Sequence, residues 1–185
     1  GSYISKLQAS GADGFFGVIA GSGAIAFIKQ AEQFGVWSKL KVKMGYSMVN
    51  ELDWDTIGAG ANGFYSEVLY TPSVVSNAAN QAFVSGWKQK YGSDPNYQDA
   101  TAYLGAQILF AAMQQSHSVD PNTVKTAMSG HTFNTIIGSV QYRPGDNQLL
   151  RPFWAGRVVA AGASHNWDVV QTVTTTPPKS AACTL

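Results

Sequence analysis

The stretch from Asp13 to Phe34 constrains the fold more than any other part of this 185-residue chain. Asp13-Gly14 is a turn pair, and Phe15 to Ile19 is a short apolar run bounded by glycines. Such a run is typical of a buried strand in a parallel sheet. Gly21-Ser22-Gly23 then interrupts the chain, and the spacing of the apolar residues changes after it.

A helix is predicted after this glycine loop, because the apolar residues now recur at helical spacing. They are Ala24, Phe27, Ile28, Ala31 and Phe34. Ser22 is expected to cap the helix, and Gly35 to end it in a left-handed conformation. A strand, a tight loop and a helix form the building unit of an open α/β sheet, whose ligands bind beyond the carboxyl ends of the strands. The loop from Ile19 to Gly23 is therefore the first candidate site.

The same loop also matches a dinucleotide fingerprint, G-x-G-x-x-A, from Gly21 to Ala26. That fingerprint requires an acidic residue at the end of the next strand to hold the ribose hydroxyls. The next predicted strand, Lys41 to Gly45, leads into Tyr46-Ser47-Met48, and no acidic residue occurs before Glu51. A nucleotide-dependent enzyme that uses this loop is thus an alternative interpretation, and we expect no cofactor.

Composition excludes several classes of protein. The chain is 45% hydrophobic and 12% charged with a net charge of +1, so it is neither disordered nor a nucleic-acid binder by composition. No apolar run reaches the roughly 20 residues that span a bilayer. Cys183 is the single cysteine, so an internal disulfide is excluded. Low charge with many glycines and small polar residues is typical of exported proteins, and Gly1-Ser2 is typical of the remnant of a cleaved tag.

Catalysis and metal binding are not expected from the sequence. His117, His131 and His165 lack the spacing of metal ligands, and no G-x-S-x-G motif activates a serine. Glu51, Asp53 and Asp55 are closely spaced acidic residues, and one interpretation is that two of them form a pair for general acid–base catalysis. The favoured interpretation is a solvated helix start, where acidic side chains suit the helix dipole.

The second half of the chain is predicted to be helical and then β-rich. Ala102 to Met113 is apolar on nearly every face, so its helix should be buried on all sides. Thr174 to Leu185 has no periodicity and is predicted to be a tail. The other predicted elements are helices from Ser76 to Gly92, Tyr97 to Gln115 and Asp120 to Gly130, strands at Phe64 to Tyr70, Thr135 to Tyr142, Pro152 to Val159 and Trp167 to Val173, and a turn at Pro144 to Asn147.

Four segments, in this order, resemble the type I periplasmic solute-binding proteins of ABC importers, in the branch that binds branched-chain amino acids, urea and amides. They are Ala12 to Gly35, Ala61 to Thr71, Phe83 to Met113 and Ile136 to Val158. The resemblance implies an α/β parallel-sheet fold with two lobes joined by hinge crossings. In that family a solute is trapped between the lobes when the hinge closes.

The resemblance also implies an organisation into segments. Residues 1–62 resemble the later part of the second lobe, 63–72 a hinge crossing, 73–136 the later part of the first lobe, and 137–173 the returning hinge with terminal strands. Residues 174–185 are the tail. The N-terminal section of the family is absent, so we expect sheet edges and apolar faces to be exposed. The isolated chain is then expected to self-associate or to pair with that missing segment.

Residue by residue, the resemblance places ligand contacts in two loops of the second lobe, and weaker candidates in the first lobe. They are Ile19, Ala20, Gly21 and Ser22, then Tyr46, Ser47 and Met48, and finally Tyr97 and Gln98. Ser22 is either a helix cap or a contact, and Tyr46 either stacks on a planar ligand or covers the core edge. Amino-acid-binding relatives usually carry an acidic residue in the second loop, where this chain has Ser47 and Met48. The resemblance therefore implies an uncharged or anionic solute, such as a small amide or carboxylate.

The predicted function is non-catalytic. The protein is expected to capture a small solute in the periplasm and deliver it to an ABC permease of the inner membrane. A sensor that uses the same fold is a further alternative, because delivery and sensing share the same binding residues.

Overall fold

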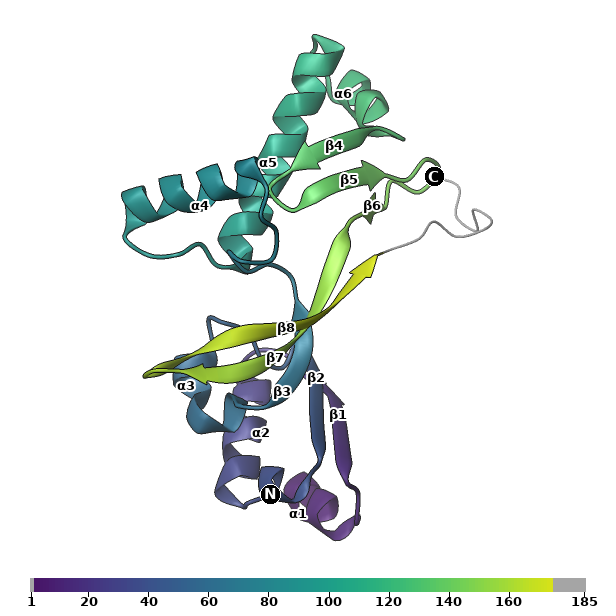
Figure 1. Cartoon of the computed structure of the whole chain (residues 1–185). Coiled ribbons are helices and arrows are strands. Elements are labelled where there is room, and N and C mark those ends of the chain that lie inside the picture. Colours follow the sequence, from purple (N-terminus) through teal and green to yellow (C-terminus); the bar gives the residue numbers. More distant parts are fainter. Residues whose placement is uncertain (1, 175–185) are drawn as a thin grey trace. The chain divides into compact units, whose positions relative to one another are not determined.

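The structure is a computed structural model that describes residues 2–174 (Figure 1). Gly1, Cys183 and the predicted tail after Thr174 lie outside the described residues. The described residues divide into two compact units, the first made of residues 2–69 and 154–172 and the second of 70–153 and 173–174. The finer segment boundaries proposed from the sequence, including a hinge at 63–72, stay a prediction.

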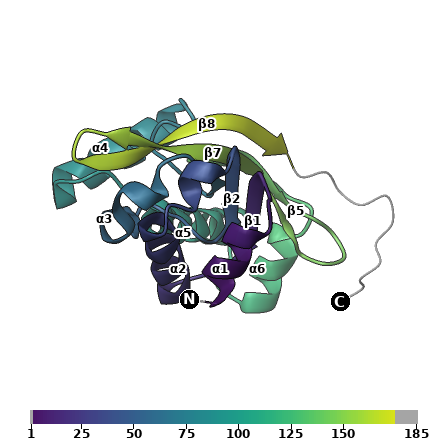
Figure 2. The same cartoon turned by 90° about the horizontal axis from the view of Figure 1, so that it is seen from below.

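The first unit is built on a five-stranded sheet in the order β1-β2-β3-β7-β8. Strands β1, β2 and β3 are parallel, and β7 pairs with β3 in the antiparallel direction. Strands β7 and β8 run side by side in both Figure 1 and Figure 2. The strands are β1 (Gly14–Val18), β2 (Val42–Tyr46), β3 (Phe64–Val68), β7 (Pro152–Ala161) and β8 (Ser164–Thr174).

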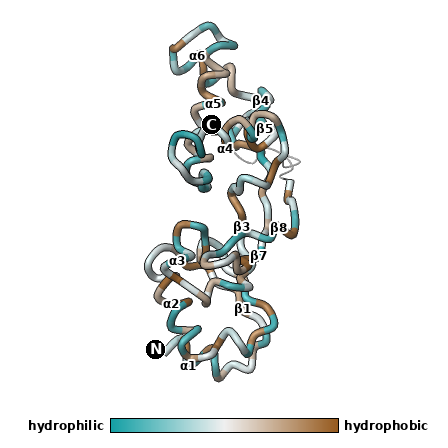
Figure 3. Tube along the Cα trace, turned by 60° about the vertical axis from the view of Figure 1, so that its left-hand side comes forward, coloured by the Kyte–Doolittle hydropathy of each residue, from teal (hydrophilic) through white to brown (hydrophobic). Residues whose placement is uncertain are grey.

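Short helices complete the first unit. They are α1 (Ser2–Ala9), α2 (Ser22–Gln33), α3 (Trp54–Ile57) and two 3₁₀ turns, η1 (Trp37–Lys39) and η2 (Gly58–Ala61). Helix α2 connects β1 to β2, which are neighbouring parallel strands, so the predicted strand–loop–helix–strand unit is confirmed. Hydrophobic residues mark both β1 and α2 in Figure 3.

One face of this sheet, the covered face, holds an aromatic core. The Phe15 ring stacks on Phe27 of α2 at 5.6 Å between centroids and meets the Trp37 ring edge-on at 5.4 Å. Phe64 of β3 lies 5.1 Å from Trp37, and the indole Nε1 donates to the carbonyl O of Ile28 at 3.0 Å. Aromatic pairs in this geometry add to the stability that their burial already provides.

The opposite face, the open face, carries exposed apolar side chains. Phe16 and Val18 each keep 65% of their surface exposed. Val42, Met44 and Tyr46 of β2 are also exposed on this face, which they share through the strand register. The prediction that β1 is buried is therefore wrong, because Phe16 and Val18 are exposed and Phe15 is only half-buried. Side chains alternate along a strand, and α2 and η1 cover only the face that carries Phe15.

The predicted C-terminal end of α2 is confirmed, and the predicted N-terminal cap is wrong. Gly21 occupies the N-cap position and Ser22 is the first helical residue, so Ser22 does not cap the helix with its side chain. At the other end, Gly35 has a φ of 63°, as predicted, and its N–H donates to the carbonyl O of Glu32 at 2.9 Å. The positive φ favours glycine because it has no Cβ.

The second unit combines three helices with a small sheet in the order β4-β5-β6. Each helix begins at a side-chain cap: Asn77 for α4, Asn96 for α5 and Asp120 for α6. The elements are α4 (Ala78–Tyr91), α5 (Tyr97–Ser116), α6 (Pro121–Met128), β4 (Thr132–Thr135), β5 (Gly138–Tyr142) and β6 (Leu149–Leu150).

Two predictions for this unit need correction. The strand predicted from Thr135 to Tyr142 begins with the last residue of β4, and a turn at Ile136 and Ile137 separates it from β5. Helix α5 is buried on one stripe only, at Ala100, Leu104, Ile108 and Ala112. Phe110 on another face is 60% exposed, because the elements that pack on α5 in this unit cover a single side.

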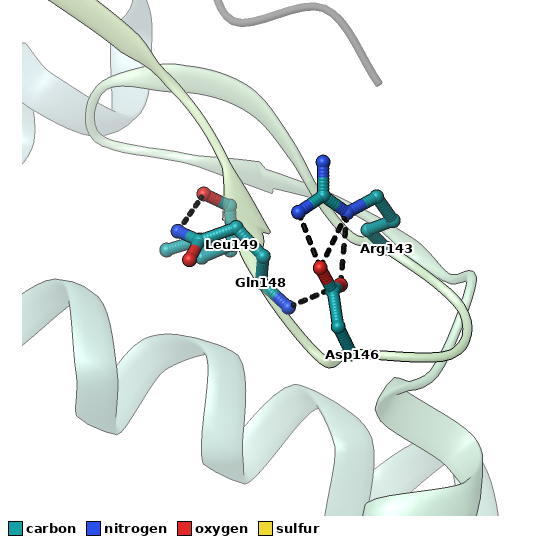
Figure 4. A network of polar contacts seen from close by, with 4 residues as sticks. All are labelled: Arg143, Asp146, Gln148 and Leu149. Atoms are coloured by element: carbon teal, nitrogen blue, oxygen red, sulfur yellow. Dashed lines mark hydrogen bonds and ion pairs between the residues drawn. The ribbon is translucent and has the colours of Figure 1, made fainter. Parts of the chain in front are cut away.

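The predicted turn at Pro144 to Asn147 is confirmed by the link between β5 and β6 (Figure 4). The Arg143 guanidinium donates to both carboxylate oxygens of Asp146, with Nε at 2.8 Å from Oδ1. The same Oδ1 accepts the N–H of Gln148 at 3.1 Å. The hydrogen bonds from Arg143 hold the pKa of the Asp146 carboxyl below its usual range.

Candidate functional site

The candidate site lies at the carboxyl ends of β1 and β2. The parallel register places Val18 beside Tyr46, so the loop that follows each strand leaves the same edge of the sheet. The four predicted residues of the first loop, Ile19, Ala20, Gly21 and Ser22, are all exposed. The structure therefore brings the two predicted loops of this unit together at one edge.

The first loop presents an open helix N-terminus. Gly21 has φ 63° and ψ −146°, a conformation that is essentially restricted to glycine. Its carbonyl O accepts the N–H groups of Ala24 and Ile25 at 3.0 and 3.2 Å. No side chain caps α2, so the first amides of the helix are left to bind water or a ligand.

The second loop divides between the surface and the core. Tyr46 is 56% exposed on the open face, and Ser47 is half-buried with a φ of 57°. Met48 is 1% exposed, and its side chain fills the space beside Gly17 and Gly45, where a Cβ atom would collide with it. The prediction that Met48 contacts a ligand does not fit this burial, because the two glycines admit its side chain beneath the loop.

Sequence analysis missed the acidic residue of this loop cluster. Glu67 of β3 accepts the backbone N–H of Ser47 at Oε1, 2.9 Å away, and the Ser47 hydroxyl at 3.3 Å. The hydroxyl of Ser66 lies 2.7 Å from Glu67 Oε2 and 2.6 Å from the carbonyl O of Gly45. The sequence feature that indicates this residue is its position as the single acidic residue inside the β-rich run Phe64 to Tyr70. Only the pairing of β2 with β3 brings it to Ser47.

Tyr97 and Gln98 lie in the second unit, in the first turn of α5. Asn96 and Asp99 form a capping box there, and Gln98 Nε2 donates to the Tyr97 hydroxyl at 3.2 Å. Gln98 is exposed and Tyr97 is half-buried. These two residues belong to a different unit from the two loops, and their contact with a shared ligand stays a prediction.

The three acidic residues around α3 are engaged in separate contacts. Asp53 accepts from Asn50 Nδ2 at 2.6 Å, Asp55 accepts from the Ser164 hydroxyl at 3.1 Å, and Glu51 accepts from Trp167 Nε1 at 3.4 Å. Each carboxylate has its own partner, either Asn50 before α3 or a residue of β8, which favours the structural interpretation over an acid–base pair.

The described residues offer neither a cluster of metal ligands nor a membrane-spanning helix. Within residues 2–174, no three histidine, cysteine or acidic side chains gather in a way that suits a metal ion. No helix of the described chain combines the length and hydropathy needed to cross a membrane.

Comparison with known proteins places these features in a family. A family model described as "Periplasmic binding protein" matches residues 1–163. The Leu/Ile/Val-binding protein homolog 7 of Brucella suis biovar 1 (strain 1330) is 26% identical in an alignment over 132 residues that covers 69% of this chain and 33% of that protein. The chain thus spans about a third of the length of this curated relative.

Solved structures show the same fold. The amino acid ABC transporter substrate-binding protein from Pseudomonas fluorescens Pf-5 matches with a TM-score of 0.86 at 24% identity, over 100% of this chain and 50% of that one. A solute-binding protein from Rhodopseudomonas palustris HaA2, in complex with p-hydroxybenzoic acid, matches with a TM-score of 0.79 at 23% identity, over 96% and 49%. The fold is that of a type I periplasmic binding protein, and the chain spans about half of each structure.

Proposed function

The chain belongs to the periplasmic binding protein family, and from this premise we propose that it captures a small solute at the loops that follow β1 and β2. The observation that carries the proposal is the meeting of these two loops at the carboxyl ends of neighbouring parallel strands. Ligands of open α/β sheets bind at such edges. The uncapped N-terminus of α2 at the same edge supports this location, because its free amides are hydrogen-bond donors.

The proposed solute is a small amide, carboxylate or amino-acid-like molecule. Tyr46 is exposed beside Ser47 and offers a ring on which a planar group stacks, together with a hydroxyl. Solutes of this size occur in the comparison: the Brucella protein is named for leucine, isoleucine and valine, and a Rhodopseudomonas protein is in complex with p-hydroxybenzoic acid. Tyr97 and Gln98 are proposed as further contacts from the second unit.

We further propose that the protein works in the periplasm and hands its solute to an ABC permease of the inner membrane. The family match supports this role, and a sensor built on the same fold remains the alternative.

The open face of the first unit supports one more proposal. Phe16, Val18 and Met44 form an exposed apolar surface, and such surfaces promote association. We propose that this face pairs with a second copy of the chain or with a preceding segment of the protein.

Equilibrium dialysis tests the solute-binding proposal without requiring high affinity. The chain is dialysed against millimolar leucine, p-hydroxybenzoate, benzamide and NADH in separate cells. We expect saturable binding of at least one of the three small solutes and none of NADH. Saturable binding of NADH alone would instead support a nucleotide-dependent enzyme that uses Gly21 to Ala26.

A matched pair of glycine variants locates the site. Gly21→Ala and Gly11→Ala both place a side chain at a positive φ, 63° and 68°, with no other atom within 4 Å. The two variants therefore share a similar positive φ and open surroundings, but only Gly21 lies at the proposed site. We expect Gly21→Ala to weaken solute binding about tenfold or more relative to Gly11→Ala. Equal affinities of the two variants would place the site elsewhere.

A further inference from the structure

Glu67 is an acidic residue in the interior of a strand, and two of its three hydrogen bonds go to Ser47 of the candidate site. Its side chain is half-buried on β3, and Oε1 accepts both the N–H and the hydroxyl of Ser47. Oε2 lies 2.7 Å from the hydroxyl of Ser66. The carboxylate therefore contacts the second loop directly at Ser47, the residue that follows the exposed Tyr46.

Two features distinguish Glu67 from a carboxylate that only stabilises the fold. Its three contacts come from neutral groups, and no Lys, Arg or His of residues 2–174 lies within ion-pair distance of it. A carboxylate has about four acceptor positions, so capacity for a further donor remains. In addition, its partner Ser47 adopts φ 57°, a conformation that costs a non-glycine residue energy and persists where the surroundings enforce it.

We propose that Glu67 is the residue that determines the charge of the solute, and this inference rests on the proposed function. The carboxylate places one uncompensated negative charge at the Ser47 loop. A half-buried site of this kind favours a ligand group that carries a protonated nitrogen or an NH₂ group, such as an ammonium, an amidinium or a primary amide, and disfavours a carboxylate. The sequence-based expectation of a site without an acidic residue is thereby replaced.

A purely structural role for Glu67 makes a different prediction. If Glu67 only holds Ser47 in its left-handed conformation, then the acceptor atom matters and the charge does not. Glu67→Gln separates the two roles, because the amide Oε1 still accepts the N–H of Ser47 while the charge is lost. Glu67→Ala removes both. Asp13→Asn is the matched control, since Asp13 is an exposed carboxylate that pairs with Lys41 beyond the amino end of β1.

The test uses three probes of nearly equal size and different charge: benzamidine, benzamide and benzoate. Each is dialysed at millimolar concentration against the wild-type chain, Glu67→Gln and Asp13→Asn. We expect the wild type and Asp13→Asn to prefer benzamidine and benzamide over benzoate. In Glu67→Gln the ratio of benzamidine to benzoate affinity should fall about tenfold.

The outcomes distinguish the inference from the function on which it rests. If the probes bind and the affinity ratio is the same in Glu67→Gln as in the wild type, solute binding stands and the charge role of Glu67 is refuted. If neither chain binds any probe or any solute of the earlier panel, the proposed function fails and this inference fails with it.

Hydrogen exchange provides a second readout that needs no ligand. The amide of Ser47 should be protected in the wild type and in Glu67→Gln, and should exchange at least about tenfold faster in Glu67→Ala. Unchanged protection in Glu67→Ala would show that the Ser47–Glu67 hydrogen bond does not form, which would overturn the inference independently of any binding measurement.

Discussion

The two faces of the first unit's sheet are made from the same strands, but one face is covered by other elements and the other is exposed. Phe15 and Phe64 pack against Trp37 and Phe27 on the covered face, whereas Phe16 and Val18 lie exposed on the open face. Adjacent residues of β1 with similar hydrophobicity therefore contribute very differently to stability. Apolar content alone therefore does not identify the core, because burial depends on which face another element covers.

The candidate site lies at the edge where these two faces meet. Met48 reaches under the loop into the covered face, while Tyr46 belongs to the open face. Ser47 lies between them and is held by Glu67. The loop is thus anchored from the core side and accessible from the other side, an arrangement that combines rigidity with access for a ligand.

Replacing one phenylalanine on each face should give the largest contrast. Phe64→Ala removes a side chain with no exposed surface and leaves a cavity beside Trp37, so we expect a loss of about 3–5 kcal/mol in the free energy of unfolding. Phe16→Ala should change it by less than about 1 kcal/mol. Urea unfolding followed by tryptophan fluorescence measures both. Similar losses for the two variants would show that the open face is buried in solution.

Glycine substitutions sharpen the same comparison at smaller scale. A Cβ atom at Gly17 or Gly45 would meet Met48 on the covered face, so each alanine variant should cost about 1–3 kcal/mol. At Gly14 the nearest atom is the carbonyl O of Val42 at 3.8 Å, so Gly14→Ala should cost less than about 1 kcal/mol. Thermal unfolding of the three variants would contradict this ranking if Gly14→Ala were the least stable.

Polar substitutions on the open face test its proposed role in association. The double variant Phe16→Ser/Met44→Ser should lower the average mass measured by light scattering, because it removes exposed apolar surface. Phe110→Ser on α5 is the control, since Phe110 is also exposed but lies in the second unit. A wild-type chain that is monomeric at high concentration would remove the basis for this proposal.

The smallest effect is expected from a charge on the covered face. The Lys43 ammonium lies 5.0 Å from the Phe64 ring centroid, and burial lowers the pKa of Lys43 below its usual 10.5. Between the lowered pKa and 10.5 the unfolded chain binds more protons, so stability should rise with pH across this window. Lys43→Met should remove that rise, and Lys41→Met, at an exposed lysine, should retain it. Identical pH profiles for the two variants would contradict the assignment.

Local sequence determined the elements of this protein well. The change from an apolar run to helical spacing at Ala24 located β1 and α2, and Gly35 marked the helix end with its positive φ. Asp120-Pro121 and Gly92 likewise marked the start of α6 and the end of α4. These signals are reliable because they depend on backbone conformation and on contacts within a few residues.

Tertiary structure alone decided which of these residues are exposed at the candidate site and which are buried beside it. Met48 is the neighbour of Ser47 in the sequence, yet it is buried because Gly17 and Gly45 leave room for it. Glu67 lies 20 residues from Ser47 in the chain, and only the pairing of β2 with β3 joins them. Sequence periodicity describes a residue's own element, whereas burial and charge at a site depend on the neighbours that a different element brings.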